Sequence, residues 1–129
     1  MDAPLIERLD HLVLTVADIE RTVDFYRRVL GMRHEVFGAG RHALAFGQQK
    51  FNLHQAGREF EPKARQPLPG AIDLCLITAW PLAQLQAHLA AQGVVVEEGP
   101  VRRTGALGPI ESVYFRDPDG NLIEVGRYL

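Results

Sequence analysis

Cysteine is nearly absent from the sequence: the 129 residues contain one, so no disulfide can form within a chain. Cys75 lies in the apolar run IDLCLI, where a small buried hydrophobe is more common than a reactive nucleophile. Apolar runs of membrane-spanning length are also absent. The N-terminal stretch MDAPLIERLDHLVLTV lacks the basic and uninterrupted apolar regions of a signal peptide. We therefore expect a soluble, cytoplasmic protein that does not bind a membrane.

An excess of charge of one sign is missing as well. The chain has 14 Lys and Arg against 16 Asp and Glu, for a formal net charge of −2, and no run of like charges. This pattern argues against a nucleic-acid partner and against a disordered acidic or basic tail. A chain of 129 residues with 47% hydrophobic residues can bury one core of ordinary size. We expect a single domain over residues 1–129.

Two halves of the sequence show the same order of expected elements. In each half, a β-branched and leucine-rich strand precedes a helix with apolar residues at spacings of three and four, and three short strands follow. The expected strands and helices cover residues 9–16, 19–30, 33–37, 42–47 and 50–54, and then 71–78, 81–93, 94–101, 110–117 and 121–128. The sequence thus predicts an α+β fold of two βαβββ modules, at 6–56 and 71–129, joined by a linker at 57–70.

Metal-capable side chains recur at matching places in the two halves. Overlaying LDHLVLTV on AIDLCLIT places His11 against Asp73, while KFNLH and GNLIE end in His54 and Glu124. Any one of these would ordinarily be a solvated or ion-paired residue. If the two sheets face each other about a pseudo-twofold axis, the four converge. Their mixed nitrogen and oxygen donors suit one divalent transition metal per site, either Mn, Fe, Co, Ni or Zn.

Two segments, LDHLVLTVADIERTVDFYRRVLGM and SVYFRDPDGNLIEV, resemble the vicinal oxygen chelate superfamily of glyoxalases, bleomycin resistance proteins and extradiol dioxygenases. The middle of the chain is most similar to the glyoxalase domain-containing protein 5 group. The resemblance implies curved mixed sheets that enclose a metal-binding cavity, with His11, His54 and Glu124 as ligands. Asp73 departs from the family pattern, which commonly has His there. It is either a fourth ligand or an acceptor that tunes the metal-bound water.

Further polar residues are candidates for binding a substrate. Alternation along IESVYFRDP turns Ser112 and Tyr114 toward the cavity, and this pair resembles the substrate-contacting Tyr and Ser of the fosfomycin thiol transferases. A core tyrosine bonded to the backbone is the alternative for Tyr114. Alternation also places Lys50 and Asn52 on the face of His54.

The segment GPVRRTGALGP, residues 99–109, has the glycine and proline content of a flexible loop that covers a site. Arg103, with Arg102 before it, could bind a carboxylate or phosphate from such a loop. Solvated loop charges are the alternative reading of either arginine.

These residues predict a metal-dependent enzyme with lyase, isomerase or transferase chemistry on a small oxygenated substrate, in which the metal acts as a Lewis acid. Glu124 is the candidate general base and Tyr114 a second catalytic candidate. Two alternatives are an Fe(II) extradiol-type dioxygenase and a metal-free small-molecule or drug binding protein of the same fold. A homodimer is expected. The sequence leaves open whether the site lies within one chain or between two.

Overall fold

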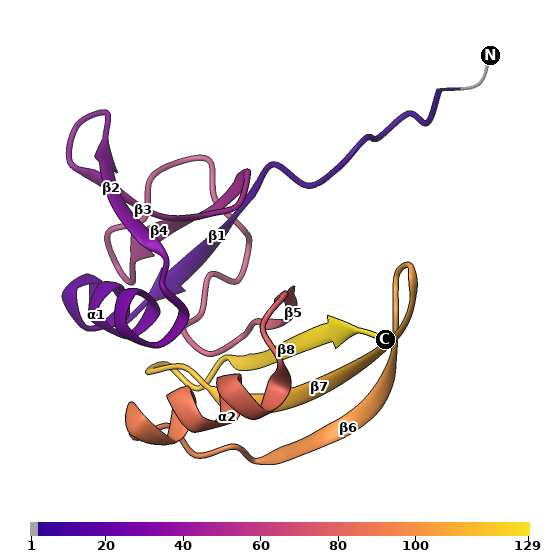
Figure 1. Cartoon of the computed structure of the whole chain (residues 1–129). Helices are drawn as coiled ribbons and strands as arrows, with labels where there is room; N and C mark the ends of the chain where they lie inside the picture. The colour runs from indigo at the N-terminus through magenta and orange to yellow at the C-terminus, as the bar shows by residue number, and fades with distance from the viewer. Residues whose placement is uncertain (1–2) are drawn as a thin grey trace.

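The computed structural model describes residues 3–129 and confirms the two modules (Figure 1). Module one contains β1 (His11–Val16), α1 (Ile19–Leu30), β2 (Arg33–Phe37), β3 (Arg41–Phe46) and β4 (Gln49–Gln55). Module two contains β5 (Asp73–Ile77), α2 (Leu82–Ala91), β6 (Glu98–Gly105), β7 (Gly108–Arg116) and β8 (Leu122–Tyr128). No helix within residues 3–129 has the length and apolar character to span a membrane.

Each module forms one four-stranded mixed sheet, in the orders β1-β4-β3-β2 and β5-β8-β7-β6. The first and last strands of a module pair in parallel, and the other pairs are antiparallel. In each module the helix connects the first strand, at one edge of the sheet, to the second strand, at the other edge. The last strand then pairs in parallel beside the first, as a crossover connection allows. The two sheets are curved and not closed, and they form separate layers with an α-helix on each (Figure 1).

Helix α1 shows how local sequence fixes these elements. The Asp18 side chain accepts a hydrogen bond from the Arg21 backbone N–H at 3.0 Å, which satisfies one of the free donors at the helix N-terminus. At the other end Gly31 adopts a φ of 66°, a left-handed conformation that favours glycine. Val23, Tyr26 and Val29 form the buried stripe between these caps.

The modules pack against each other through their helix-bearing sides. Phe25 of α1 lies 6.5 Å from the Phe115 ring of β7, and the Tyr26 hydroxyl donates to the Asp117 carboxylate at 2.7 Å. His88 of α2 donates to the Val29 carbonyl at 2.9 Å. One apolar cluster includes residues of both helices and all four of the central strands β3, β4, β7 and β8. The opposite face of each sheet, here called the outer face, therefore points away from the seam between the modules.

The predicted loop at 99–109 is wrong. Residues 98–105 form β6 and pair antiparallel with β7, from Glu98 opposite Tyr114 to Gly105 opposite Gly108. Pro100 is tolerated because it lies where the register shifts, between Glu98 and Val101. The strand expected at 94–101 accordingly begins only at Glu98. Arg102 and Arg103 are thus strand residues and not part of a flexible cover.

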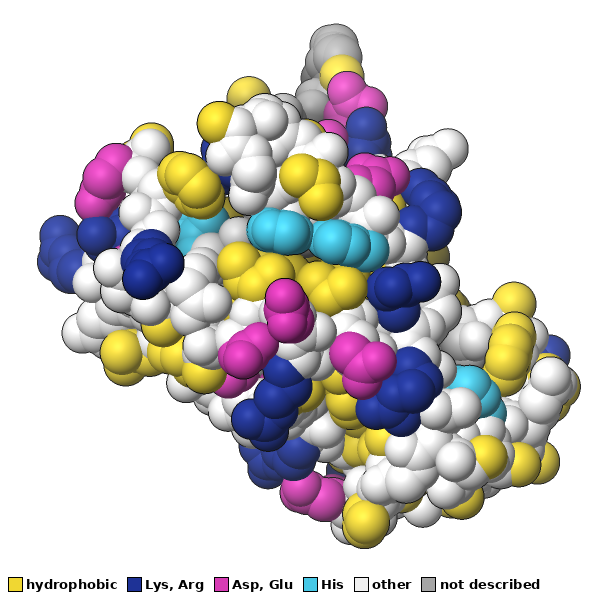
Figure 2. Space-filling model, turned by 90° about the vertical axis from the view of Figure 1, so that its left-hand side faces the viewer, with side chains coloured by type: hydrophobic (Ala, Val, Ile, Leu, Met, Phe, Trp, Pro, Cys, Tyr) yellow, Lys and Arg dark blue, Asp and Glu magenta, His cyan; other side chains and the backbone are white. Residues whose placement is uncertain are grey.

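Side chains of both charge signs are interspersed over the face drawn in Figure 2. Lys and Arg lie beside Asp and Glu there, which matches the near-neutral net charge of the chain.

Candidate functional site

The outer face of module one carries four of the residues singled out from the sequence, His11, Lys50, Asn52 and His54. In the parallel pairing of β1 with β4, His11 lies opposite Lys50, Val13 opposite Asn52 and Thr15 opposite His54. His11 and His54 are therefore four residues apart along the sheet, about 13 Å at the usual rise of a strand. Side chains that project in parallel at this separation do not meet at one ion.

The outer face of module two carries Asp73 and Glu124. The pairing of β5 with β8 shows which residues of module one occupy the equivalent positions. Asp73 lies opposite Leu122, and Cys75 lies opposite Glu124. If His11 and Asp73 are matched as the first residues of β1 and β5, Glu124 corresponds to Asn52, and His54 corresponds to Gly126. The predicted equivalence of His54 and Glu124 is therefore wrong by two residues, an offset that the alternation of side chains does not reveal.

The structure does not gather a metal-binding set within one chain. Over residues 3–129 there is no group of three His, Cys, Asp or Glu side chains placed to hold a metal ion. His11 is half-exposed, and its Nδ1 lies 2.8 Å from Asp10 Oδ1. Asp73 is exposed on the other module. That His11, His54, Asp73 and Glu124 bind a metal stays a prediction.

Asn52 has an unusual environment for a buried amide. The residue is 7% exposed, and its Oδ1 has no hydrogen-bond partner among residues 3–129. A buried acceptor without a partner costs about 1–3 kcal/mol, so such an atom usually serves a ligand, an ion or a water molecule. Asn52 thus provides a free oxygen donor at the position that corresponds to Glu124.

His54 lies among residues that the sequence analysis did not identify. Its Nε2 is 3.4 Å from Arg41 Nη2, and its ring packs edge-on against Phe60 of the linker, with centroids 5.6 Å apart. Burial, assisted by the Arg41 guanidinium, lowers the pKa of His54, so the neutral imidazole accepts from Arg41. Arg41 could have been found from alternation along β3, but the approach of Phe60 from a linker has no local sequence signal.

Tyr114 is positioned on the outer face of module two, directly opposite Glu124. Its hydroxyl accepts from Arg103 Nε at 3.0 Å, and Arg103 Nη2 donates to Glu98 at 3.0 Å. Burial raises the pKa of Tyr114, and the Glu124 carboxylate adds to this shift. Arg103 is therefore a strand residue that forms an ion pair with Glu98 and orients the Tyr114 hydroxyl.

Two other side chains complete this face. Cys75, expected to be buried, is exposed. Partial burial of its thiol first, and then the Glu124 carboxylate, raise its pKa to about 11, which leaves the thiol protonated at neutral pH. Ser112 is fully buried, and no described residue forms a hydrogen bond with its Oγ. Ser112 shares the predicted face but is not open to solvent in the single chain.

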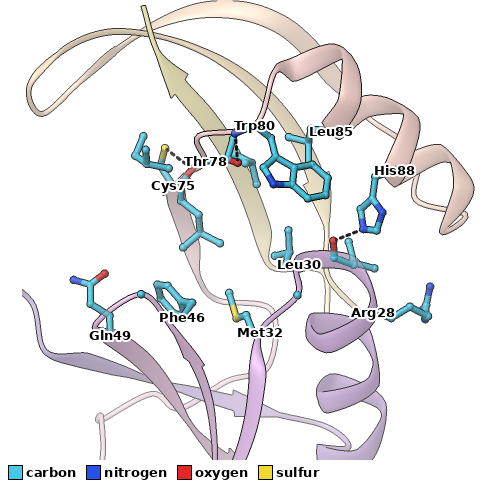
Figure 3. Close-up of a pocket in the computed structure, with 16 residues that line it drawn as sticks. Arg28, Leu30, Met32, Phe46, Gln49, Cys75, Thr78, Trp80, Leu85 and His88 are labelled. Atoms are coloured by element: carbon cyan, nitrogen blue, oxygen red, sulfur yellow. Dashed lines mark hydrogen bonds between the residues drawn. The ribbon is translucent and has the colours of Figure 1, made fainter.

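A hollow between the modules does not coincide with these residues. A cavity of about 710 Å³ lies along the seam between the modules, where Met32 and Phe46 of module one face Trp80 and Leu85 of module two (Figure 3). Its wall is mainly apolar, and none of the four predicted metal ligands lines it. His88 lines the cavity, but its Nε2 is bonded to the Val29 carbonyl, so the outer faces, which carry the predicted site residues, are the better candidate site.

Comparison with known proteins agrees with the arrangement of the two modules. Residues 8–125 match the model of the Glyoxalase/Bleomycin resistance protein/Dioxygenase superfamily. The chain is 54% identical to virulence protein STM3117 of Salmonella typhimurium over 97% of this chain and 87% of that protein. It is 57% identical to glyoxalase domain-containing protein RDO1 of Mycosarcoma maydis, over 95% of this chain and 69% of that protein.

Solved structures of similar proteins have the same fold. The integron cassette protein VCH_CASS1, from the mobile metagenome of V. cholerae, is 59% identical, with a TM-score of 0.96 over 99% of this chain and 100% of that chain. Two more distant structures share the fold alone, each at 23% identity. They are a lactoylglutathione lyase from Agrobacterium tumefaciens, with a TM-score of 0.74 over 96% of both chains, and the antibiotic binding protein TnmS3 from Streptomyces, with a TM-score of 0.76 over 98% of this chain and 100% of that chain.

Proposed function

Because this chain belongs to the glyoxalase/bleomycin resistance protein/dioxygenase superfamily, we propose that it is a divalent-metal-dependent enzyme whose site forms between two copies of the chain. The observation that carries the proposal is the division of the donor residues between two outer faces that point away from each other. His11 and Asn52 lie on one face, and Asp73 and Glu124 lie on the other. A twofold dimer that places module one of one copy against module two of the other completes two equivalent sites.

The residues that would hold the metal are His11 and Asn52 of one copy with Asp73 and Glu124 of the partner subunit. One imidazole nitrogen and three oxygens suit Mn²⁺, Fe²⁺, Co²⁺, Ni²⁺ or Zn²⁺. Asn52 takes precedence over His54 in this proposal because its Oδ1 is without a partner, whereas His54 Nε2 already accepts from Arg41. When bound, the metal supplies Lewis-acid polarisation of adjacent oxygens on a small oxygenated substrate.

The chain's own side chains then bind the substrate and move a proton. The raised pKa of Tyr114 keeps its hydroxyl protonated, so it donates a hydrogen bond to a substrate oxygen. Arg103 donates to this hydroxyl through Nε and so orients it. Glu124 lies across from Tyr114 and would accept a proton from the substrate carbon in lyase or isomerase chemistry after it leaves the metal.

The proposal is tested by measuring metal content in untagged protein by elemental mass spectrometry. We expect about one transition-metal ion per chain in the parent, loss of the metal in His11→Ala and Glu124→Ala, and weakened retention in Asn52→Ala. His54→Ala is the matched control, because it removes a potential ligand from the same strand face and should keep the metal. Loss of the metal in His54→Ala with retention in Asn52→Ala would instead restore His54 as the ligand.

The same measurement separates the alternatives. Bound iron together with oxygen consumption would favour the extradiol-type dioxygenase. An absence of binding on titration with each of the five metals, with unchanged stability in all four variants, would refute the metalloenzyme and favour a metal-free binding protein.

A further inference from the structure

The Arg41 guanidinium lies over two aromatic rings, those of Phe37 and Phe60. Its Cζ lies 5.3 Å from the centroid of Phe37 and 4.6 Å from the centroid of Phe60. A guanidinium stacked in this way leaves the N–H groups at its edge available for hydrogen bonding. Its Nε is buried and has no hydrogen-bond partner in the part of the chain that the structure describes. Arg41 is therefore a positioned cation with unused donor capacity.

A second cation lies at the same ring. Lys50 Nζ is 4.1 Å from the centroid of Phe37, on the strand next to that of Arg41. Within residues 3–129, neither Arg41 nor Lys50 forms an ion pair. Two like charges at one partly buried ring repel each other, and an anion between them would offset this repulsion.

The nearby carboxylates do not fill this role, because each has another partner. Glu59 accepts from the Gly57 backbone N–H at 2.7 Å, and Glu61 pairs with Lys63 at 2.7 Å. Asp10 binds His11 at 2.8 Å, and Lys50 is the smallest of the influences that lower the Asp10 pKa.

His54 and Asn52 form the base of this arrangement. His54 is 3% exposed and accepts from Arg41, which fixes the direction of the guanidinium. Asn52 lies between Lys50 and His54 on the same face of β4, at the position proposed to hold the metal. Along β4, Lys50 therefore lies on one side of Asn52, and His54 with its partner Arg41 lies on the other.

We propose that Arg41 and Lys50 bind an oxyanion of the substrate, a carboxylate or a phosphate, in a cradle formed by Phe37, Arg41, Lys50, His54 and Phe60. That this oxyanion belongs to a substrate rests on the proposed function. The substrate is then an anionic molecule, with the charged group at the cradle and its reacting oxygens toward Asn52. A planar guanidinium and an ammonium together match the geometry of either oxyanion.

The test uses the full chain after treatment with EDTA, so that anion binding is measured apart from any metal. Inorganic phosphate and acetate are titrated at constant ionic strength while the ring-proton NMR signals of His54 are followed. We expect saturable shifts in the parent and affinity that falls about tenfold in Arg41→Gln and in Lys50→Gln, as for the loss of one charge-assisted hydrogen bond. Arg127→Gln is the matched control and should bind like the parent, because it removes one exposed positive charge from module two.

Tighter binding of phosphate than of acetate would identify a phosphate-bearing substrate, and the reverse order a carboxylate. Unchanged affinity in both Arg41→Gln and Lys50→Gln, or no saturable shift with either anion, would overturn the inference. Thermal unfolding of each variant confirms that the fold is retained. If no metal binds but anion binding depends on Arg41, the anion cradle is supported and the metalloenzyme proposal is refuted. If the metal binds as expected but anion binding does not depend on Arg41 or Lys50, the metalloenzyme proposal is supported and the cradle is refuted.

Discussion

Tyr26→Phe should weaken the seam that holds the two modules with their outer faces apart. The Tyr26 hydroxyl is fully buried and donates to Asp117 Oδ2 at 2.7 Å across the seam. The same carboxylate accepts from the Asp119 and Asn121 backbone N–H groups at 2.9 Å each and from Asn121 Nδ2 at 2.8 Å. Phenylalanine keeps the ring contacts with Phe25 and removes only the hydroxyl.

The expected loss of unfolding free energy is about 2 kcal/mol, within the 1.5–3 kcal/mol typical of hydrogen bonds to charged groups. Asp117 keeps its other three donors, so a larger loss is not expected. Urea denaturation should show a lower midpoint with an unchanged m-value. Tyr128→Phe is the control. Tyr128 is partly exposed, and its hydroxyl accepts from the Leu107 backbone N–H at 3.1 Å, so its loss should cost less than about 1 kcal/mol. Equal stabilities of Tyr26→Phe and the parent would refute the reasoning that this bond fixes the seam.

Two further predictions follow from the pKa shifts. In EDTA-treated protein, Glu124→Gln should lower the Cys75 pKa from about 11, because it removes a neighbouring negative charge that opposes the thiolate. Alkylation of Cys75 by iodoacetamide at pH 8 should then be faster. An unchanged rate would show that Glu124 does not face Cys75. The folded state lowers the His54 pKa below its ordinary 6.5. The contribution of His54 to the unfolding free energy should therefore be fully present above pH 6.5 and be lost as the pH falls through the folded pKa. Urea titrations should show a flatter pH dependence in His54→Gln, and an equal slope in the variant would contradict this prediction.

The fold was largely predictable because the hydrophobic periods of the two halves agree with the elements formed. Both helices and the order of strands were evident from spacing and caps such as Asp18. The error at 99–109 arose because proline and glycine are typical of loops, yet pairing with β7 overrides that composition. Tertiary hydrogen bonding of this kind cannot be read from a short segment.

The site was predictable only in part. Alternation correctly placed Asn52 and His54 on one face of β4, but it cannot tell which of the two corresponds to Glu124, because both obey a period of two. The packing of the modules through their helices is a tertiary feature, so the sequence could not decide between a site within one chain and one shared by two. Arg41 and Phe60 were missed because their contact joins a strand to the linker.

The most direct test of the shared site is complementation of two variants that each lose the metal. His11→Ala and Glu124→Ala chains are co-expressed with different affinity tags, heterodimers are isolated through both tags, and the tags are removed before metal analysis. If the sites are shared, a heterodimer has two of them. One has both substitutions, and the other combines the intact His11 of one chain with the intact Glu124 of the other. The account predicts one metal ion per heterodimer and none in either variant alone; a heterodimer without metal, beside a parent that binds it, would contradict the account.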